Sequence, residues 1–186
     1  MEIVLASGSP RRLELLERIG LTVRVIPPDV DETRHPDEEP DQYVERIART
    51  KVNAVDGDGL VVIAADTTVV HDGHVMGKPG HPAEARSMLA RLAGDTHAVF
   101  TGVAVRSGER VSSTVDRTLV RMSPMTDDEI ARYVAGGEPM DKAGAYGLQG
   151  VGAMFVEGVE GSPSNVVGLP LHVAARLLRA HGVDPL

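Results

Sequence analysis

The stretch Leu60-Val61-Val62-Ile63-Ala64-Ala65-Asp66-Thr67-Thr68 decides the fold of this 186-residue chain. Six apolar residues in a row have the length of a strand that is buried on both faces, as in the sheets of α/β proteins. In this pattern Asp66 ends the strand, and α/β proteins bind their ligands at the carboxyl ends of their strands. A carboxylate there can bind a hard cation or take a proton from water. An Asp that only caps the turn is the alternative.

Strand and helix signals alternate on both sides of this run, which is the pattern of an α/β protein. Asp72-Gly73 and Ser107-Gly108-Glu109 are turns that join antiparallel strands, so the predicted sheet is mixed. Further strands are expected at 3–6, 22–26, 98–106, 110–122 and 153–159. Helices are expected at 11–19, 40–55, 82–93, 127–134 and 171–180, the fourth with a capping box between Thr126 and Glu129. No repeat or linker interrupts the pattern, so residues 1–186 are expected to form one domain.

The composition excludes several classes of protein. The 27 acidic residues outnumber the 19 basic ones, and a net charge of -8 repels a nucleic-acid polymer. No apolar run reaches the roughly 20 residues that span a bilayer, and residues 1–7 lack the regions of a signal peptide. The absence of cysteine excludes disulfides, thiolate catalysis and zinc bound by sulfur. We expect a cytoplasmic protein that binds neither a nucleic-acid polymer nor a membrane.

The segment Ser7-Gly8-Ser9-Pro10-Arg11-Arg12 has the features of an anion site. Ser9 is placed to cap a helix that begins at Pro10, so free backbone N–H groups face one point. Arg11 and Arg12 lie in the first turn, where the helix dipole disfavours cations. A phosphate among them would explain this placement, because guanidinium groups bind phosphate oxygens with paired hydrogen bonds. An ordinary helix start with two solvated arginines is the alternative.

Lys51 occupies the apolar side of the helix predicted from Pro40. Its neighbours on that side follow i, i+3, i+4, i+7 spacing and are Val44, Ile47, Ala48 and Val55. A lysine in this position either extends its amine to water or contacts a buried anion. The residue alone favours the first interpretation.

Three further positions are ambiguous from residue type. Glu32, in the acidic loop 27–39, can supply a second carboxylate or be solvated, and Lys78 in Gly77-Lys78-Pro79 can contact an anion or be exposed. Gln149 lies in the glycine-rich segment Asp141–Gly150, where a backbone can approach a ligand closely. Its amide offers both donor and acceptor and can bind a base edge.

Seven short motifs occur in an order that resembles the Maf family of nucleoside triphosphate pyrophosphatases, over essentially the whole chain. They are Ser7–Arg12, Ala65-Asp66-Thr67, Gly77-Lys78-Pro79, Thr101-Gly102-Val103, Asp141–Gly150, Gly161-Ser162 and Asn165–Pro170. Each motif is weak alone, whereas the ordered combination is specific. One departure is Ser162-Pro163-Ser164, in a loop that more often carries an aromatic residue.

The resemblance implies an inosine-triphosphatase-like α/β fold, with an elongated mixed β-sheet, flanking helices and a cleft between two lobes. Proteins of this family are often dimeric, so a homodimer is an expected assembly. The resemblance also implies cleavage between the α and β phosphates, which gives nucleoside monophosphate and pyrophosphate. A divalent metal cation, Mg²⁺ or Mn²⁺, is the implied cofactor.

The resemblance also assigns roles to individual residues. Asp66 matches the family's catalytic aspartate. The positions that handle phosphate and metal are matched by Ser7, Arg12, Glu32, Lys51 and Lys78, with Glu32 and Asp66 as the metal ligands. The positions that separate the family's branches are matched by Arg11, Thr67 and Gln149. At these three positions the chain resembles the branch directed at dTTP and UTP, whereas the 7-methyl-GTP branch typically carries Trp, Gln and Glu.

The sequence therefore predicts hydrolysis of nucleoside triphosphates, preferentially dTTP, UTP and modified pyrimidine nucleotides. Such an activity would clean nucleotide pools or restrain cell division. Asp66 can act as a general base or position water through the metal, and both mechanisms stay open at this point. The alternatives are a pyrophosphatase directed at 7-methyl-GTP and a nucleotide-binding regulator of septum formation without turnover. A pure regulator need not keep Asp66, which argues against it.

Overall fold

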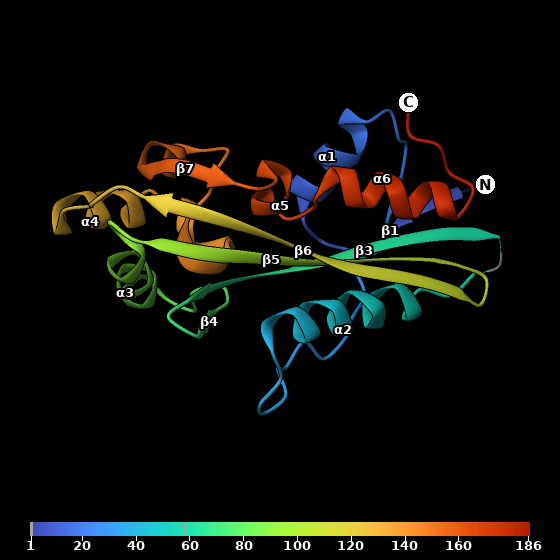
Figure 1. The fold of residues 1–186 in the computed structure, drawn as a ribbon, viewed down its shortest axis with the longest axis horizontal. Helices are drawn as coiled ribbons and strands as arrows, with labels where there is room; N and C mark the ends of the chain where they lie inside the picture. Colours follow the sequence, from blue (N-terminus) through green and yellow to red (C-terminus); the bar gives the residue numbers. More distant parts are fainter. Residues whose placement is uncertain (1, 58) are drawn as a thin grey trace. The chain divides into compact units, whose positions relative to one another are not determined.

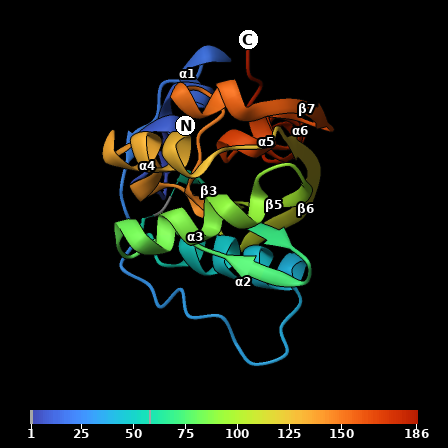
Figure 2. The same ribbon diagram turned by 90° about the vertical axis from the view of Figure 1, so that its left-hand side faces the viewer.

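A computed structural model of the chain describes residues 2–57 and 59–186 (Figures 1 and 2). Its mixed sheet has the strand order β2-β1-β3-β5-β6-β7, and β4 pairs with β3. The strands are β1 (Glu2–Leu5), β2 (Arg24–Val25), β3 (Leu60–His71), β4 (His74–Met76), β5 (Thr96–Ser107), β6 (Arg110–Met122) and β7 (Val156–Glu160). β1 is parallel to β2 and β3, whereas the β3–β4 and β6–β7 pairs are antiparallel. The predicted α/β class with a mixed sheet and flanking helices is confirmed.

The helices follow the expected order along the chain. They are α1 (Pro10–Arg18), α2 (Pro40–Asn53), α3 (Pro82–Leu92), α4 (Asp127–Ala135), α5 (Pro163–Val167) and α6 (Leu171–Ala180). The short 3₁₀ helices are η1 (Glu138–Asp141), η2 (Ala143–Ala145) and η3 (Val151–Phe155). The predicted capping box is present, since Thr126 Oγ1 accepts from the Glu129 N–H and Glu129 Oε2 accepts from the Thr126 N–H. Among the described residues, every helix is too short or too polar to cross a membrane.

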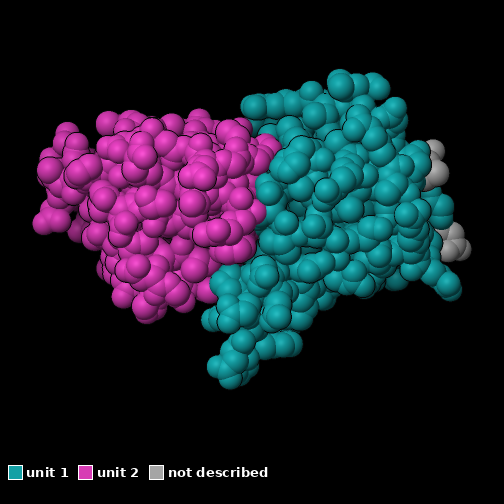
Figure 3. All heavy atoms as spheres, viewed as in Figure 1, with its two compact units in different colours: residues 1–67, 101–116, 168–186 teal, residues 68–100, 117–167 magenta. Residues whose placement is uncertain are grey.

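The chain divides into two compact units, shown in separate colours in Figure 3. Unit 1 consists of residues 1–67, 101–116 and 168–186, and unit 2 of residues 68–100 and 117–167. β3, β5 and β6 therefore each contribute residues to both units.

In unit 1, α2 covers one face of the sheet, and α1 and α6 cover the other (Figures 1 and 2). Ala48 and Val52 of α2 pack in one apolar cluster with Val4 of β1 and Val62 of β3. Gly102 in β5 permits this packing, because a Cβ atom there would lie 2.3 Å from the carbonyl oxygen of Val44. The glycine thus sets how closely α2, which carries Lys51, approaches the sheet.

In unit 2, the core lies between α3, α4 and the glycine-rich segment. Leu89 of α3 and Ile130 of α4 are buried in one cluster with Val120 of β6, Tyr146 and Phe155. Asp72 and Gly73 both have positive φ, 48° and 74°, as the predicted hairpin between β3 and β4 requires.

Several boundaries differ from the prediction. β3 continues through Asp66 to His71, so Asp66 lies inside the strand and not at its end. The residues after it are Thr67-Thr68-Val69-Val70, and their β-branched side chains favour continuation of the strand. Ser9 occupies the N-cap position of α1 without a side-chain cap, and its own N–H donates to Ser7 Oγ. The expected strand 153–159 begins only at Val156, because η3 occupies the preceding residues.

Candidate functional site

Lys51 and Asp66 form a buried ion pair at the centre of the candidate site. The Nζ atom of Lys51 lies 2.8 Å from Asp66 Oδ1 and 2.9 Å from Glu32 Oε1. Lys51 and Asp66 are only 5% and 7% exposed. The preference for a solvated Lys51 was therefore wrong, because its amine contacts two carboxylates. Glu32 is exposed to solvent, as its position in an acidic loop suggested, but its carboxylate forms an ion pair with Lys51.

Burial shifts the pKa of the charged groups in this cluster. Desolvation raises the pKa of the Asp66 carboxyl above its ordinary value, although Lys51 and Arg12 act in the opposite direction. Desolvation likewise lowers the pKa of the Arg12 guanidinium, against the attraction of Asp66 and Glu32. A carboxylate with a raised pKa accepts a proton more readily, which suits Asp66 to the work of a general base.

Arg12 is held by hydrogen bonds to three segments of unit 1. Its Nε donates to the Gly168 carbonyl at 2.8 Å, its Nη1 to Ser7 Oγ at 3.1 Å and its Nη2 to Thr67 Oγ1 at 3.1 Å. Gly168 adopts a φ of 121°, in the region that favours glycine. These contacts fix the guanidinium plane before any anion binds.

Thr67 links Arg12 to the Thr101-Gly102-Val103 motif. Its Oγ1 lies 2.9 Å from Thr101 Oγ1, and Thr101 is fully buried in β5. Thr67 was expected only as a branch-specific position. Its contacts make it part of the support of Arg12 as well.

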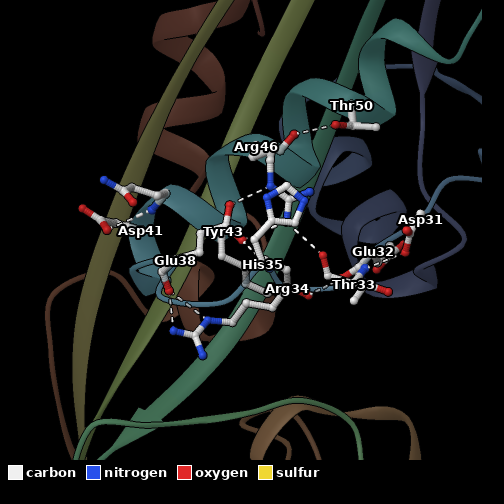
Figure 4. A network of polar contacts seen from close by, with 11 residues as sticks. Asp31, Glu32, Thr33, Arg34, His35, Glu38, Asp41, Tyr43, Arg46 and Thr50 are labelled. Atoms are coloured by element: carbon white, nitrogen blue, oxygen red, sulfur yellow. Dashed lines mark hydrogen bonds and ion pairs between the residues drawn. The ribbon is translucent and has the colours of Figure 1, made fainter.

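Helix α2 also holds the loop that carries Glu32 (Figure 4). Arg46 donates to both carboxylate oxygens of Glu38, at 2.6 and 2.8 Å, and to the Thr33 carbonyl at 3.0 Å. The Tyr43 hydroxyl donates to the Glu32 carbonyl at 3.0 Å. Burial, together with Asp66 and Glu32, raises the pKa of Tyr43 to about 12, so this hydroxyl keeps its proton.

The sequence alone did not indicate these loop contacts. The i, i+3 spacing of Tyr43 and Arg46 places them on one side of α2 and could have drawn attention to them. Their partners lie in an irregular loop, where periodicity gives no signal.

The structure brings six of the predicted site residues together in unit 1: Ser7, Arg12, Glu32, Lys51, Asp66 and Thr67. Arg11 is half-buried in the first turn of α1. Lys78 and Gln149 belong to unit 2, where both are exposed.

The carboxylates of the site fit a divalent cation that also binds substrate. Among the described residues, no three His, Cys, Asp or Glu side chains are placed to hold a metal by themselves. Glu32 and Asp66 nevertheless converge on one ammonium group. Mg²⁺ is usually bound by one or two carboxylates together with water and substrate phosphates. Glu32 and Asp66 would supply the two carboxylates, and water and the phosphates of the substrate would supply the remaining ligands.

Comparison with known proteins identifies the family. A family model described as "Maf-like protein" matches residues 2–181. The chain belongs to the Maf-like family. A relative from Anaeromyxobacter sp. (strain Fw109-5) is 53% identical over an aligned length of 185, and the alignment covers 97% of this chain and 89% of that protein. A relative from Moorella thermoacetica is 50% identical over an aligned length of 188, and the alignment covers 98% of this chain and 96% of that protein.

Both of these Maf-like relatives are named "dTTP/UTP pyrophosphatase". A third relative with this name, from Chromobacterium violaceum, is 47% identical, and the alignment covers 98% of this chain and 96% of that protein. Among solved structures, the Maf-like chain is similar to the Staphylococcus aureus Ham1 protein. That match has a TM-score of 0.45 and 15% identity, and it covers 66% of this chain and 72% of the other.

Proposed function

We propose that this Maf-like protein hydrolyses nucleoside triphosphates to the monophosphate and pyrophosphate, with a preference for dTTP and UTP. The observation that carries the proposal is the contact of Lys51 with Asp66 and Glu32, beside the fixed guanidinium of Arg12. The names of relatives about half identical in sequence support the same substrates.

In this proposal, basic side chains bind the triphosphate. Arg12 presents a fixed guanidinium and Lys51 a buried amine, in water-poor surroundings where electrostatic stabilisation of phosphate is strong. The N-terminus of α1 adds backbone N–H groups. Lys78 is the further cation that the family resemblance assigns to the phosphates, and Ser7 contributes by holding Arg12.

Asp66 activates the attacking water. The water oxygen forms a bond to the α-phosphorus, and the bond from this phosphorus to the α–β bridging oxygen breaks. Pyrophosphate leaves with the electron pair, and the Asp66 carboxylate accepts the proton of the water. The raised pKa of Asp66 supports this role.

Glu32 and Asp66 are the proposed ligands of a divalent cation, Mg²⁺ or Mn²⁺. When bound, such an ion neutralises phosphate charge and lowers the pKa of a coordinated water. The ion would then share with Lys51 and Arg12 the balancing of the two carboxylates, so the Lys51 amine could bind a phosphate oxygen.

Arg11, Thr67 and Gln149 are the proposed specificity residues. The Gln149 amide can donate and accept at the O4–N3 edge that uracil and thymine share. The 5-methyl group of thymine adds only about 1 kcal/mol in a pocket, so dTTP and UTP should be poorly separated.

The proposal extends to the protein as a whole. A single family model over residues 2–181 and three strands that serve both units support one functional domain, residues 1–186. We place the protein in the cytoplasm, where it would clean nucleotide pools or restrain cell division. The homodimer stays a prediction that light scattering would test.

One experiment tests the activity. The purified protein is incubated with Mg²⁺ and UTP, dTTP, CTP, GTP or 7-methyl-GTP, and monophosphate and pyrophosphate are measured. We expect both products, fastest from UTP and dTTP. A preference for 7-methyl-GTP would overturn the assignment to the dTTP/UTP branch. Release of orthophosphate would overturn the proposed cleavage between the α and β phosphates. Binding without turnover would support the alternative, a nucleotide-binding regulator.

A further inference from the structure

Glu138 is half-buried beside the glycine-rich segment and has no part in the chemistry above. Its Oε1 accepts from the Tyr133 hydroxyl at 2.9 Å and from the Gly152 N–H at 3.1 Å, and its Oε2 accepts from the Val151 N–H at 2.8 Å. The hydrogen bonds from Gly152, Val151 and Tyr133 together outweigh the effect of burial and lower the pKa of Glu138. The carboxylate therefore binds the backbone that follows Gln149.

Two glycines, one at the end of this segment and one just after it, make room for Glu138 and its partner Tyr133. A Cβ atom on Gly150 would lie 2.4 Å from Glu138 Oε2, and one on Gly152 would lie 2.4 Å from the Tyr133 hydroxyl oxygen. For the segment Asp141–Gly150, the sequence suggested that glycines let the backbone approach a ligand. At these two positions the close approach is made by the protein's own side chains.

Tyr133 extends the same contacts to the other side of Gln149. Its hydroxyl, which donates to Glu138, also accepts from the Gly147 N–H at 3.1 Å. Gly147 precedes Gln149 by two residues, and Val151 follows it by two. The Tyr133–Glu138 pair thus holds the backbone on both sides of Gln149, whose own side chain is exposed.

We propose that Glu138, together with Tyr133, is a positioning residue for base recognition by Gln149. The inference rests on the proposed function, in which the Gln149 amide binds the base edge. An amide discriminates between bases only if its donor and acceptor are both in place, since a polar site rejects a base that leaves its groups unpaired. Without the Tyr133–Glu138 pair, the backbone around Gln149 would sample many orientations. Discrimination between bases would then decrease more than the affinity for the triphosphate.

The test compares three variants in unit 2. Glu138→Gln removes the charge and one acceptor, Tyr133→Phe removes the hydroxyl, and Glu157→Gln is the control. Glu157 undergoes the same substitution on β7, where its carboxylate pairs with Arg121 in solvent. For each variant, kcat/KM is measured with UTP, dTTP, CTP and GTP, and binding of α,β-methylene-UTP is measured by calorimetry.

For Glu138→Gln we expect kcat/KM for UTP and dTTP to fall about tenfold, as loss of a hydrogen bond to a charged group suggests. The values for CTP and GTP should stay within about twofold, because these nucleotides rely on the triphosphate contacts. Tyr133→Phe should act in the same direction, and Glu157→Gln should match the wild type. In a Gln149→Ala background, Glu138→Gln should cause no further loss of discrimination.

Other outcomes would overturn the inference. An equal decrease in kcat/KM with all four nucleotides, accompanied by a lower Tm, would show that Glu138 has only a structural role. An unchanged preference for UTP and dTTP in a folded Glu138→Gln protein would also refute the inference. If Glu138→Gln does not fold, the same comparison is made with Tyr133→Phe. Failure of the proposed function is seen separately, since a wild-type protein that releases no pyrophosphate would refute that function before any variant is compared.

Discussion

Arg46 and Glu38 are joined by two hydrogen bonds, 2.6 Å long from Nε and 2.8 Å long from Nη2. The hydrogen bonds from Arg46 lower the pKa of Glu38 to about 2, so the pair stays charged at physiological pH. Arg46 also donates to the Thr33 carbonyl, next to Glu32. The pair therefore ties the Glu32 loop to the helix that carries Lys51.

Removal of this pair should loosen the loop. We expect Arg46→Ala to speed hydrogen exchange in residues 31–38 and to lower pyrophosphate release by about tenfold or less, because the pair is partly exposed. Arg49→Ala, on the same helix, is the control. Equal exchange rates in both variants would contradict the role of Arg46.

Loss of the Asp66 carboxylate should abolish catalysis without unfolding the protein. Asp66→Asn keeps the size of the side chain but cannot accept a proton, so turnover should fall by roughly a hundredfold or more. Pyrophosphate release and thermal melting measure the two effects. Asp128→Asn, which removes an exposed partner of Arg132, is the control. Turnover within a few-fold of the wild type, with unchanged melting, would refute the assignment.

Removal of either buried cation should weaken triphosphate binding. Arg12→Ala and Lys51→Ala should each raise KM by about tenfold or more, because each removes a charge-assisted contact from a buried cluster. Lys51→Ala should also lower the free energy of unfolding, since it leaves Asp66 without its ammonium partner. Arg18→Ala, in the last turn of α1, should change neither quantity. An unaltered KM and kcat in Lys51→Ala would show that the amine does not contact the substrate.

A methyl group at Gly102 should displace α2. Gly102→Ala would place Cβ 2.3 Å from the Val44 carbonyl oxygen, and backbone cannot yield as a side chain does. We expect a loss of about 3 kcal/mol or more in urea unfolding, in the upper range for overpacking. Gly77→Ala, where nothing lies within 4 Å, is the control and should cost less than 1 kcal/mol on the same scale. Equal stability of the two variants would contradict the close approach of α2.

His97 should make stability depend on pH. It is 2% exposed, its Nε2 lies 2.7 Å from the Tyr146 hydroxyl, and burial lowers its pKa to about 4 from 6.5. The unfolded chain therefore binds the proton more tightly, so stability is full above about pH 6.5 and falls as the pH approaches 4. Between about pH 7 and pH 5 the loss should be about 2 kcal/mol. Urea unfolding of the wild type and His97→Gln measures it, and identical pH profiles would refute the prediction.

Local signals predicted the elements well where neighbouring residues determine them. The capping box of Thr126 and Glu129 and the turn at Asp72-Gly73 both depend on residues within one turn, and both formed as expected. Asp66 was misplaced at a strand end because a charged residue normally stops a buried strand. Its partner Lys51 lies on another element, and that ion pair stabilises the carboxylate inside β3.

At the candidate site too, the sequence did not reveal contacts between residues that are far apart along the chain. The helical periodicity placed Lys51 on the buried side of α2, but no periodicity reveals which anion faces it. The glycine-rich segment was interpreted from glycine alone, whereas its conformation depends on Glu138 and Tyr133 nearby in the fold. In both cases the residue was found from the sequence and its partner was not.

The hydrogen bond from Arg12 to the Gly168 carbonyl joins residues that are 156 positions apart. During translation, Arg12 leaves the ribosome long before Gly168 is synthesised, so the nascent chain carries this arginine without that acceptor. Unit 2 has all its residues once position 167 is made, whereas unit 1 still awaits residues 168–186. Contacts this distant in sequence form slowly, since the loop between them must close first. The guanidinium that we propose to bind the triphosphate therefore gains this contact only after Gly168 is synthesised, and a ribosome-bound chain should be inactive until then.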